Sequence, residues 1–378
     1  MKSPRTEVDL TFSLLRALSG ESGGFRGAEG GAGDGAGIRE ASWHRLIAFA
    51  SAHFVLQALA EPLKNAAPAV EVPGDVEDFL AAFHGANVER NARLLHALFD
   101  ISKALNAKGV VPCALKGAAI LLTDDGPRPA SWRFMSDLDL LVPQEDLAAC
   151  VEAMNGLGFV TADETYDPLL EAHFPPLISP CRTFSVELHT RLFGLDDFGL
   201  SPEAVMAGAT LHTYDGAELL VPAMSHRIAH LLIHAQLHNR NHAIQRLVLK
   251  DVLDLIMLQG RNPGRFGWSQ ILSSCRDPVH REAVTALLEV WRKLTGAPRV
   301  TQASPSAEAW AAQAIERLYW PRWRTLINIP GDVLRMESHR ARTENGHLRR
   351  RLKLFTDPAR VQDVTSRWAG KQRQRVWG

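Results

Sequence analysis

The spacing of apolar residues predicts that the chain begins with helices. Two amphipathic stretches, over residues 8–18 and 43–59, favour short helices. The residues between them, 20–37, are rich in Gly and offer too little apolar surface to pack, so a flexible loop is expected there. A longer stretch predicts one helix from Val76 to Ala107. Its apolar residues recur three and four positions apart, at Leu94, Leu98, Ile101 and Leu105.

After Gly109, a plausible end for that helix, the pattern changes to short apolar runs bounded by Gly and Pro. Such runs are typical of buried strands. Strands are predicted over 110–115, 136–142 and 182–189, with a short strand after Gly158 and a hairpin over 209–221. Helices over 116–122 and 146–157 separate the first of these strands. This alternation predicts an α/β (α+β) fold class with a small mixed β-sheet.

From Ser225 onward the pattern is helical almost throughout. Helices are predicted over 225–238, 243–258, 268–275, 280–294 and 307–318. Residues 335–378 then carry twelve Lys or Arg against four Asp or Glu. We therefore divide the chain into an N-terminal helical region (1–86), a core (87–221), a helical domain (222–334) and a basic tail (335–378).

Composition narrows the class of protein without naming a partner. The 378 residues are 46% hydrophobic and 22% charged, as expected of a folded protein with two domains or one extended core. The formal net charge is zero, so bulk electrostatics favours no acidic or basic partner. The four cysteines show no C-x-x-C spacing, which argues against a disulfide framework or zinc site. The beginning of the chain lacks a signal-peptide pattern, and the apolar run 46–60 is too short to span a bilayer, so we expect a cytoplasmic protein without a membrane partner.

Two acids on one predicted strand are the first candidates for chemistry. Asp137 and Asp139 stand two residues apart, and such residues point to the same face of a strand. Neighbouring carboxylates resist burial unless a cation lies between them, and Mg²⁺ or Mn²⁺ prefers oxygen ligands of this kind. An isolated Asp-x-Asp is more often a solvated strand edge. The apolar residues around this pair favour a buried metal site instead.

Other strands and turns supply possible partners for the pair. Glu187 lies on a strand with apolar alternation and would add a third carboxylate if the two strands are neighbours; alternatively it is a surface residue. Lys116 and Gly117 stand at a strand-to-helix turn, where glycine allows close approach of a ligand and free backbone N–H groups bind phosphate. Arg133 precedes the acidic pair and has the geometry to bind phosphate oxygens in a fork.

The strings LKGAAILL, RFMSDLDLLV and VELH together resemble the uncharacterised nucleotidyltransferase family within the DNA polymerase β-like nucleotidyltransferase superfamily. The resemblance covers residues 87–189, with a looser match to about Leu258. It implies that Asp137, Asp139 and Glu187 are the catalytic, metal-binding acids and that Gly117 begins the site. The turn departs from the Gly-Ser or Gly-Gly of many members, because Ala118 supplies no hydroxyl; Lys116 is the candidate substitute.

The implied chemistry is metal-assisted transfer of a nucleoside monophosphate from an NTP to an acceptor hydroxyl or phosphate, with Mg²⁺ (or Mn²⁺) as cofactor. The resemblance leaves four classes of acceptor open: a small molecule, a peptide, a protein or an RNA. Candidate substrate-binding residues are Lys116, Gly117, Arg133, Ser136, His189, His234 and His238. Because clustered carboxylates repel one another without metal, Asp139→Asn is expected to leave the metal-free protein as stable or slightly more stable.

Histidine recurs every fourth residue from His226 to His242, a pattern that also suits transition-metal sites. Four residues advance a helix about 40° beyond one turn, so the five side chains cannot meet at one ion. We favour an interpretation in which they line the helix–core interface or the cleft. The basic tail is more easily explained as a solvated or partner-binding segment than as a nucleic-acid site, although nucleic acid stays possible.

Two alternatives to a nucleotidyltransferase remain open. The first is a non-catalytic nucleotide-binding module that acts as a regulator or antitoxin. A module that has lost catalysis is expected to lose its metal-binding carboxylates first. Asp137, Asp139 and Glu187 are all present, which argues against this alternative. The second is a transition-metal enzyme that uses the histidines. Metal analysis of the purified protein would distinguish it.

Overall fold

The computed structural model describes residues 5–19, 40–66, 72–123, 130–162, 172–193, 198–261, 267–273, 275, 277–320, 328, 331, 332 and 335. The predicted Gly-rich loop and the basic tail beyond Arg335 lie outside these residues. Every structural statement below concerns the described part of the chain.

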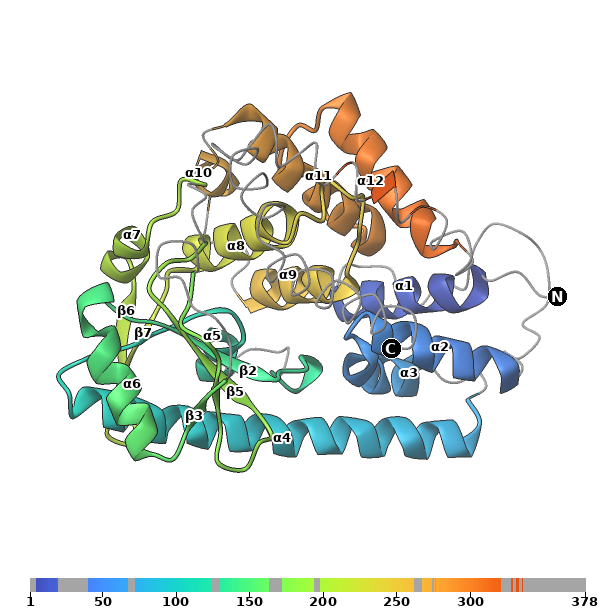
Figure 1. Cartoon of the computed structure of the whole chain (residues 1–378). Coiled ribbons are helices and arrows are strands. Elements are labelled where there is room, and N and C mark those ends of the chain that lie inside the picture. The colour runs from blue at the N-terminus through green and yellow to red at the C-terminus, as the bar shows by residue number, and fades with distance from the viewer. Residues whose placement is uncertain are drawn as a thin grey trace, which may run out of the picture.

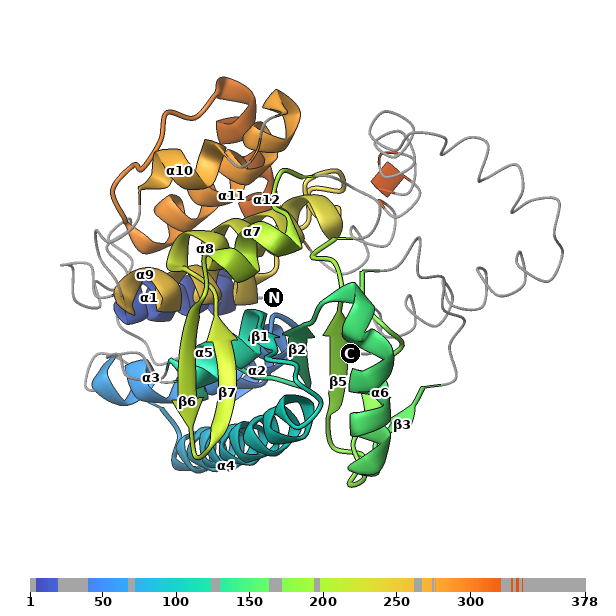
Figure 2. The ribbon, with the colours of Figure 1, turned by 90° about the vertical axis from the view of Figure 1, so that its left-hand side faces the viewer.

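A mixed sheet holds the middle of the chain, as its apolar alternation predicts. Within the described residues, seven strands lie in the order β3-β4-β5-β2-β1-β7-β6 (Figure 2). β2 is parallel to β5 and β1 to β7, whereas the other neighbours are antiparallel. The strands are β1 (Cys113–Ala114), β2 (Asp137–Leu141), β3 (Val160–Thr161), β4 (Leu177–Ile178), β5 (Ser185–His189), β6 (Thr210–Tyr214) and β7 (Ala217–Val221). The predicted mixed-sheet fold class is confirmed, and β4 is a strand that the pattern did not reveal.

The N-terminal helices differ from the prediction at one break. α1 (Arg5–Ser19) forms as expected, but the predicted helix over 43–59 is two elements, α2 (Glu40–Ala52) and a 3₁₀ turn (Leu56–Ala58). Phe54 separates them with a left-handed φ of 56°. That conformation turns the chain, and Val55 and Leu56 directly after it are buried. α3 (Ala60–Ala66) follows.

The longest helix lies along the lower side of the molecule in Figure 1. α4 (Gly74–Asn106) packs against β7, α3, α5 and α6. Its apolar stripe, including Leu94, Leu98, Ile101 and Leu105, is buried as predicted. The predicted domain boundary at residue 87 therefore falls inside this helix. α5 (Lys116–Leu122) and α6 (Leu147–Gly156) connect the early strands, and α7 (Pro202–Ala207) precedes the β6–β7 hairpin.

The helices after β7 form a layer above the sheet in Figure 1. They are α8 (Met224–Ile233), a π-helical turn (His234–His238), α9 (Leu249–Arg261), α10 (Trp268–Ser273), α11 (Pro278–Thr295) and α12 (Pro305–Leu318). The predicted helix over 243–258 begins too early, because Arg240 and Gln245 have left-handed φ angles and only turns connect 239 to 248. Helix α1 packs on α9 and α11, so the first helix joins this layer.

Within the described residues, no single helix is both long enough and apolar enough to cross a membrane. One bent pair, Trp43–Ala52 with Leu56–Asn65, passes the test of length and composition only when both parts are taken together.

Candidate active site

The register of two parallel strands brings the predicted acids together. Asp139 on β2 pairs with Glu187 on β5, and Asp137 pairs with Ser185. Paired residues of neighbouring strands share a face, and so do residues two apart. Asp137, Asp139, Glu187 and His189 therefore lie on one face, while Leu138 and Leu140 are buried on the other.

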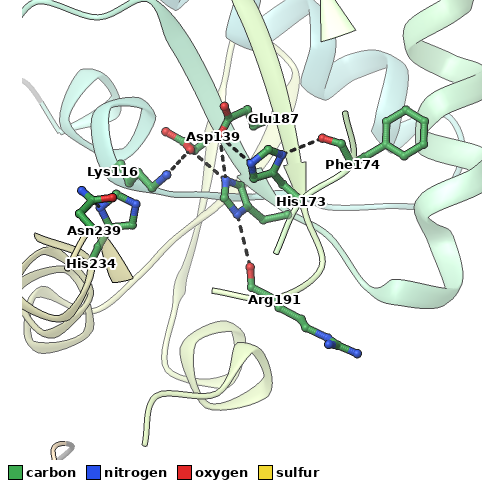
Figure 3. A network of polar contacts seen from close by, with 9 residues as sticks. Lys116, Asp139, His173, Phe174, Glu187, Arg191, His234 and Asn239 are labelled. Atoms are coloured by element: carbon green, nitrogen blue, oxygen red, sulfur yellow. Dashed lines mark hydrogen bonds and ion pairs between the residues drawn. The ribbon is translucent and has the colours of Figure 1, made fainter. Parts of the chain in front are cut away.

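Asp139 is the centre of a polar network (Figure 3). Its Oδ1 accepts a hydrogen bond from Lys116 Nζ at 2.6 Å and lies 2.9 Å from His189 Nε2. Burial opposes ionisation of Asp139, which is 2% exposed, but the Lys116 ammonium and His189 hold the pKa of its carboxyl well below the usual range. Burial alone would lower the pKa of Lys116, but the carboxylates of Asp139, Glu187 and Asp137 raise it.

Glu187 completes a set of groups able to hold a cation. Donor atoms of Asp139, Glu187 and His189 all lie within 4.8 Å of one another. Glu187 Oε2 is 3.5 Å from His189 Nε2 and 3.8 Å from His173 Nε2. Asp137 lies outside this set of three. Burial, followed by the charges of Asp139 and Glu187, raises the pKa of Asp137, so this acid senses the same negative cluster.

The turn before α5 is strained in a way that places Lys116. This residue has a φ of 44°, a left-handed conformation that costs a non-glycine residue about 1–3 kcal/mol. The next residue, Gly117, has to be glycine because a Cβ there would lie 2.3 Å from Arg133 Nη1 and 2.7 Å from Met135 Sδ. The sequence predicts that a ligand approaches the backbone closely at Gly117. In the structure, the Arg133 guanidinium occupies this position instead.

Arg133 joins the sheet to the helical layer. Its Nε donates to Asp254 Oδ1 of α9 at 2.9 Å, and both side chains are buried. Lys250 Nζ lies 3.4 Å from the other oxygen of Asp254. Burial would raise the pKa of Asp254, but Arg133 and Lys250 outweigh it and lower that pKa. Asp254 therefore holds two cations in place instead of acting as a free acid.

A cavity lies where these elements meet. Lys116 and Arg133 line it from the sheet side, and Arg227, His234 and Lys250 line it from the helices. Asp251 and Asp254 also contribute to its wall; burial raises the pKa of Asp251 to about 6. The two predicted phosphate ligands thus face one cavity. Lys250 and Arg227 were missed, because only the approach of α8 and α9 to the sheet brings them there.

Comparison with known families shows which family the chain belongs to. Residues 39–296, about two thirds of the chain, match the model of the uncharacterised nucleotidyltransferase family. The chain belongs to this nucleotidyltransferase family. The resemblance seen in the sequence is confirmed, and the family match includes the acids, the cavity and α11.

The chain is also similar to solved structures. It is similar to the antibiotic-resistance factor ANT(2'')-Ia, with 12% identity, a TM-score of 0.28, and coverage of 66% of this chain and 98% of that one. It is also similar to an antigenic nucleotidyltransferase-like protein from Paracoccidioides brasiliensis, with 16% identity, a TM-score of 0.34, and coverage of 56% and 95%. A comparison with curated proteins gives no match.

The histidines between His226 and His242 lie in separate environments. His230 is buried and packs its ring against Phe193, and His234 stacks on His238 with ring centroids 5.0 Å apart. The π-helical turn over 234–238 brings this pair into register. His242 instead stacks on Trp310. No histidine of the stripe belongs to a three-ligand metal set among the described residues, and His230 and His234 line the cavity.

Buried His230 should make the stability of the protein depend on pH. Burial lowers its pKa from 6.5 to about 3. Between these values the unfolded chain binds the proton and the folded chain does not, so stability falls as the pH drops. At pH 5 the difference amounts to about 2 kcal/mol for this one group. Urea denaturation at pH 7.5 and 5 should show this loss in the wild type and a smaller loss in His230→Leu. Equal losses would show that His230 is protonated in the folded state.

Proposed function

We propose that the chain is a metal-dependent nucleotidyltransferase that moves a nucleoside monophosphate from an NTP to an acceptor hydroxyl or phosphate. The observation that carries the proposal is the pairing of Asp139 with Glu187 on parallel strands, beside a cavity lined by cations. Such an arrangement suits a ligand that combines a divalent metal with phosphates.

The donor set fits a hard or borderline divalent cation. One carboxylate oxygen of Asp139 lies within 4.8 Å of one of Glu187, and Asp137 adds a third carboxylate on the same face. Mg²⁺ (or Mn²⁺) bound by these residues would neutralise the triphosphate and lower the pKa of an acceptor hydroxyl. The protein's own contribution is to hold Asp139 ionised and opposite Glu187 before substrate arrives.

The cations of the cavity suit the phosphate groups of the NTP. Lys116 is aimed by its strained backbone, and Arg133 is fixed by Asp254 and by the absence of a side chain at Gly117. Lys250 supplies a further positive charge from α9. We assign these residues to phosphate binding. The acceptor would enter past the exposed Ser136 or the half-buried His234 and His238, and its class (small molecule, peptide, protein or RNA) follows from none of these contacts.

One observation favours a non-catalytic nucleotide-binding module. Lys116 and His189 already surround the Asp139 carboxylate with positive charge, which would allow the site to be stable without any metal. In a regulatory or antitoxin-like module, nucleotide would bind beside this network without reaction. The two functions differ in whether a phosphate bond breaks.

Incubation with NTPs labelled at the α- or γ-phosphate separates these functions. The purified full chain, with Mg²⁺ or Mn²⁺ and cell extract as the source of acceptor, is expected to transfer the α-label to a new product and to release the γ-label as pyrophosphate. Asp139→Asn under the same conditions is the control for contaminating enzymes in the extract. Transfer of the γ-label would indicate a kinase instead. Nucleotide binding without transfer of either label would support the binding module.

A further inference from the structure

Arg90 of α4 binds the backbone of two separate segments at once. Its Nε donates a hydrogen bond to the carbonyl oxygen of Met135 at 2.6 Å, and its Nη2 donates to that of Thr183 at 2.9 Å. The guanidinium also lies over the ring of Phe134, 4.9 Å from the ring centroid. Because a guanidinium is planar and presents its donors in a fixed fork, these contacts fix the direction as well as the distance of both segments.

The two carbonyls stand just before the strands that carry the acids. Met135 lies two residues before β2, and Thr183 lies two residues before β5. These strands are parallel neighbours, and Asp139 faces Glu187 in the third of their residue pairs. Arg90 therefore bridges the same two strands at the end where their ladder begins.

The beginning of the β2–β5 ladder is a place where the two strands can separate easily, because terminal hydrogen bonds open with little loss of packing. Asp137 belongs to the first pair of this ladder and Asp139 to the third, so opening from this end reaches both acids before it reaches Leu140 and Leu141. A bridge across the preceding residues opposes this opening. It also opposes a shift of register by one residue, which would turn Glu187 to the other face of the sheet.

Arg133, which lies close to these contacts in the sequence, has supports of its own. Its carbonyl oxygen accepts hydrogen bonds from Asn87 Nδ2 and Asn91 Nδ2, both at 3.1 Å. Its side chain is paired with Asp254. Loss of Arg90 should therefore disturb the acids more than the cations assigned to phosphate binding.

We infer that Arg90 is a positioning residue: it fixes β2 against β5 and so holds Asp139 opposite Glu187 for the transfer reaction. It acts through the two strands and not on the substrate. Its part in transfer rests on the proposed function, whereas its effect on the strands is a property of the fold and can be measured without nucleotide.

Hydrogen–deuterium exchange of the full chain, with neither metal nor nucleotide, measures the effect on the strands. In Arg90→Ala, the amides of β2 and β5 should exchange about 10-fold faster or more, because two hydrogen bonds from a charged group are lost. The amides of the β6–β7 hairpin should keep the wild-type rate. Arg90→Lys keeps the charge and the apolar stem but not the fork, and should give an intermediate rate in β2 and β5. Arg93→Ala, at an exposed arginine of the same helix, is the matched control and should change none of these rates.

Free N-ethylguanidinium distinguishes positioning from a simple loss of stability. At a concentration that leaves the wild-type melting temperature unchanged, it should fill the space that Arg90→Ala opens and restore slow exchange in β2 and β5. Ethylammonium at the same concentration lacks the fork and should restore much less. Guanidinium compounds otherwise favour unfolding, so restored protection has the opposite sign from their general effect.

The transfer assay supplies the second measurement. In Arg90→Ala, kcat for transfer of the α-label should fall about 10–100-fold, because small displacements of reacting groups are costly. KM for the NTP should change by less than about 3-fold, since the phosphate-binding cations keep their own supports. A raised KM with an unchanged kcat would contradict the inference, because Arg90 would then act on substrate binding.

Two exchange results would also overturn the positioning role. One is wild-type exchange of β2 and β5 in Arg90→Ala, or in Arg90→Lys if the alanine variant failed to fold. The other is an equal acceleration in the β6–β7 hairpin, which would show a general loss of stability. Faster exchange confined to β2 and β5, in a protein whose wild type transfers no nucleotide, would contradict only the proposed function.

Discussion

Asp139→Asn is expected to lower nucleotide transfer by about 10²–10³-fold or more, because it removes the charge of the acid at the centre of the site. Asp139 contacts both Lys116 and His189, so the substitution also frees the phosphate-binding lysine. Transfer of the α-label from NTP measures the effect. Nucleotide with Mg²⁺ or Mn²⁺ should raise the melting temperature of the wild type but not of the variant.

The stability of the same variant should fall. From the sequence, neutralising one of three clustered acids was expected to relieve repulsion. The structure reverses this sign, because Asp139 accepts charge-assisted hydrogen bonds from Lys116 and His189. Their loss should lower the free energy of unfolding by about 1–3 kcal/mol. Asp100→Asn, at an exposed position of α4, is the control and should change neither stability nor transfer. A metal-free Asp139→Asn protein as stable as the wild type would mean that this network contributes nothing to folding.

Asp254→Ala should have the largest effect on folding, lowering the free energy of unfolding by about 3–5 kcal/mol. Asp254 and Arg133 are a buried ion pair with a 2.9 Å contact, and the side chains are 5% and 7% exposed. Removal of the acid leaves the Arg133 charge buried without its partner. Because the pair links the sheet to α9, the sheet and the helical layer should also lose part of their coupling. Urea denaturation followed by circular dichroism measures the change.

The double variant Arg133→Met, Asp254→Leu separates stability from function. Apolar residues of similar size should restore most of the lost stability, since neither charge then needs a partner. NTP binding, measured by calorimetry, should be weaker than in the wild type because the guanidinium beside Gly117 is absent. If the double variant bound NTP as well as the wild type, Arg133 would be structural and its assignment to phosphate binding would be wrong.

Local patterns predicted the elements that depend on neighbouring residues. The apolar stripe of α4 was recognised because residues three and four apart share a helix face. The β6–β7 hairpin followed from Asp215 and Gly216, which take the left-handed φ angles of a tight turn. The helices that Pro278 and Pro305 begin were found within two residues at each end. Where a local rule failed, as at Phe54, burial of the following residues outweighed helix propensity.

The sequence by itself determined that Asp137 and Asp139 share a strand face, that Glu187 stands on another strand, and that the motifs match a nucleotidyltransferase family. Only the tertiary structure decided the rest. Strand register placed Asp139 opposite Glu187 and His189 beside both, and helix packing brought Lys250 and Asp254 to Arg133. The physical reason is distance along the chain. Side-chain alternation is set by each residue's own backbone, whereas register and ion pairs between residues 121 positions apart depend on how the whole core packs.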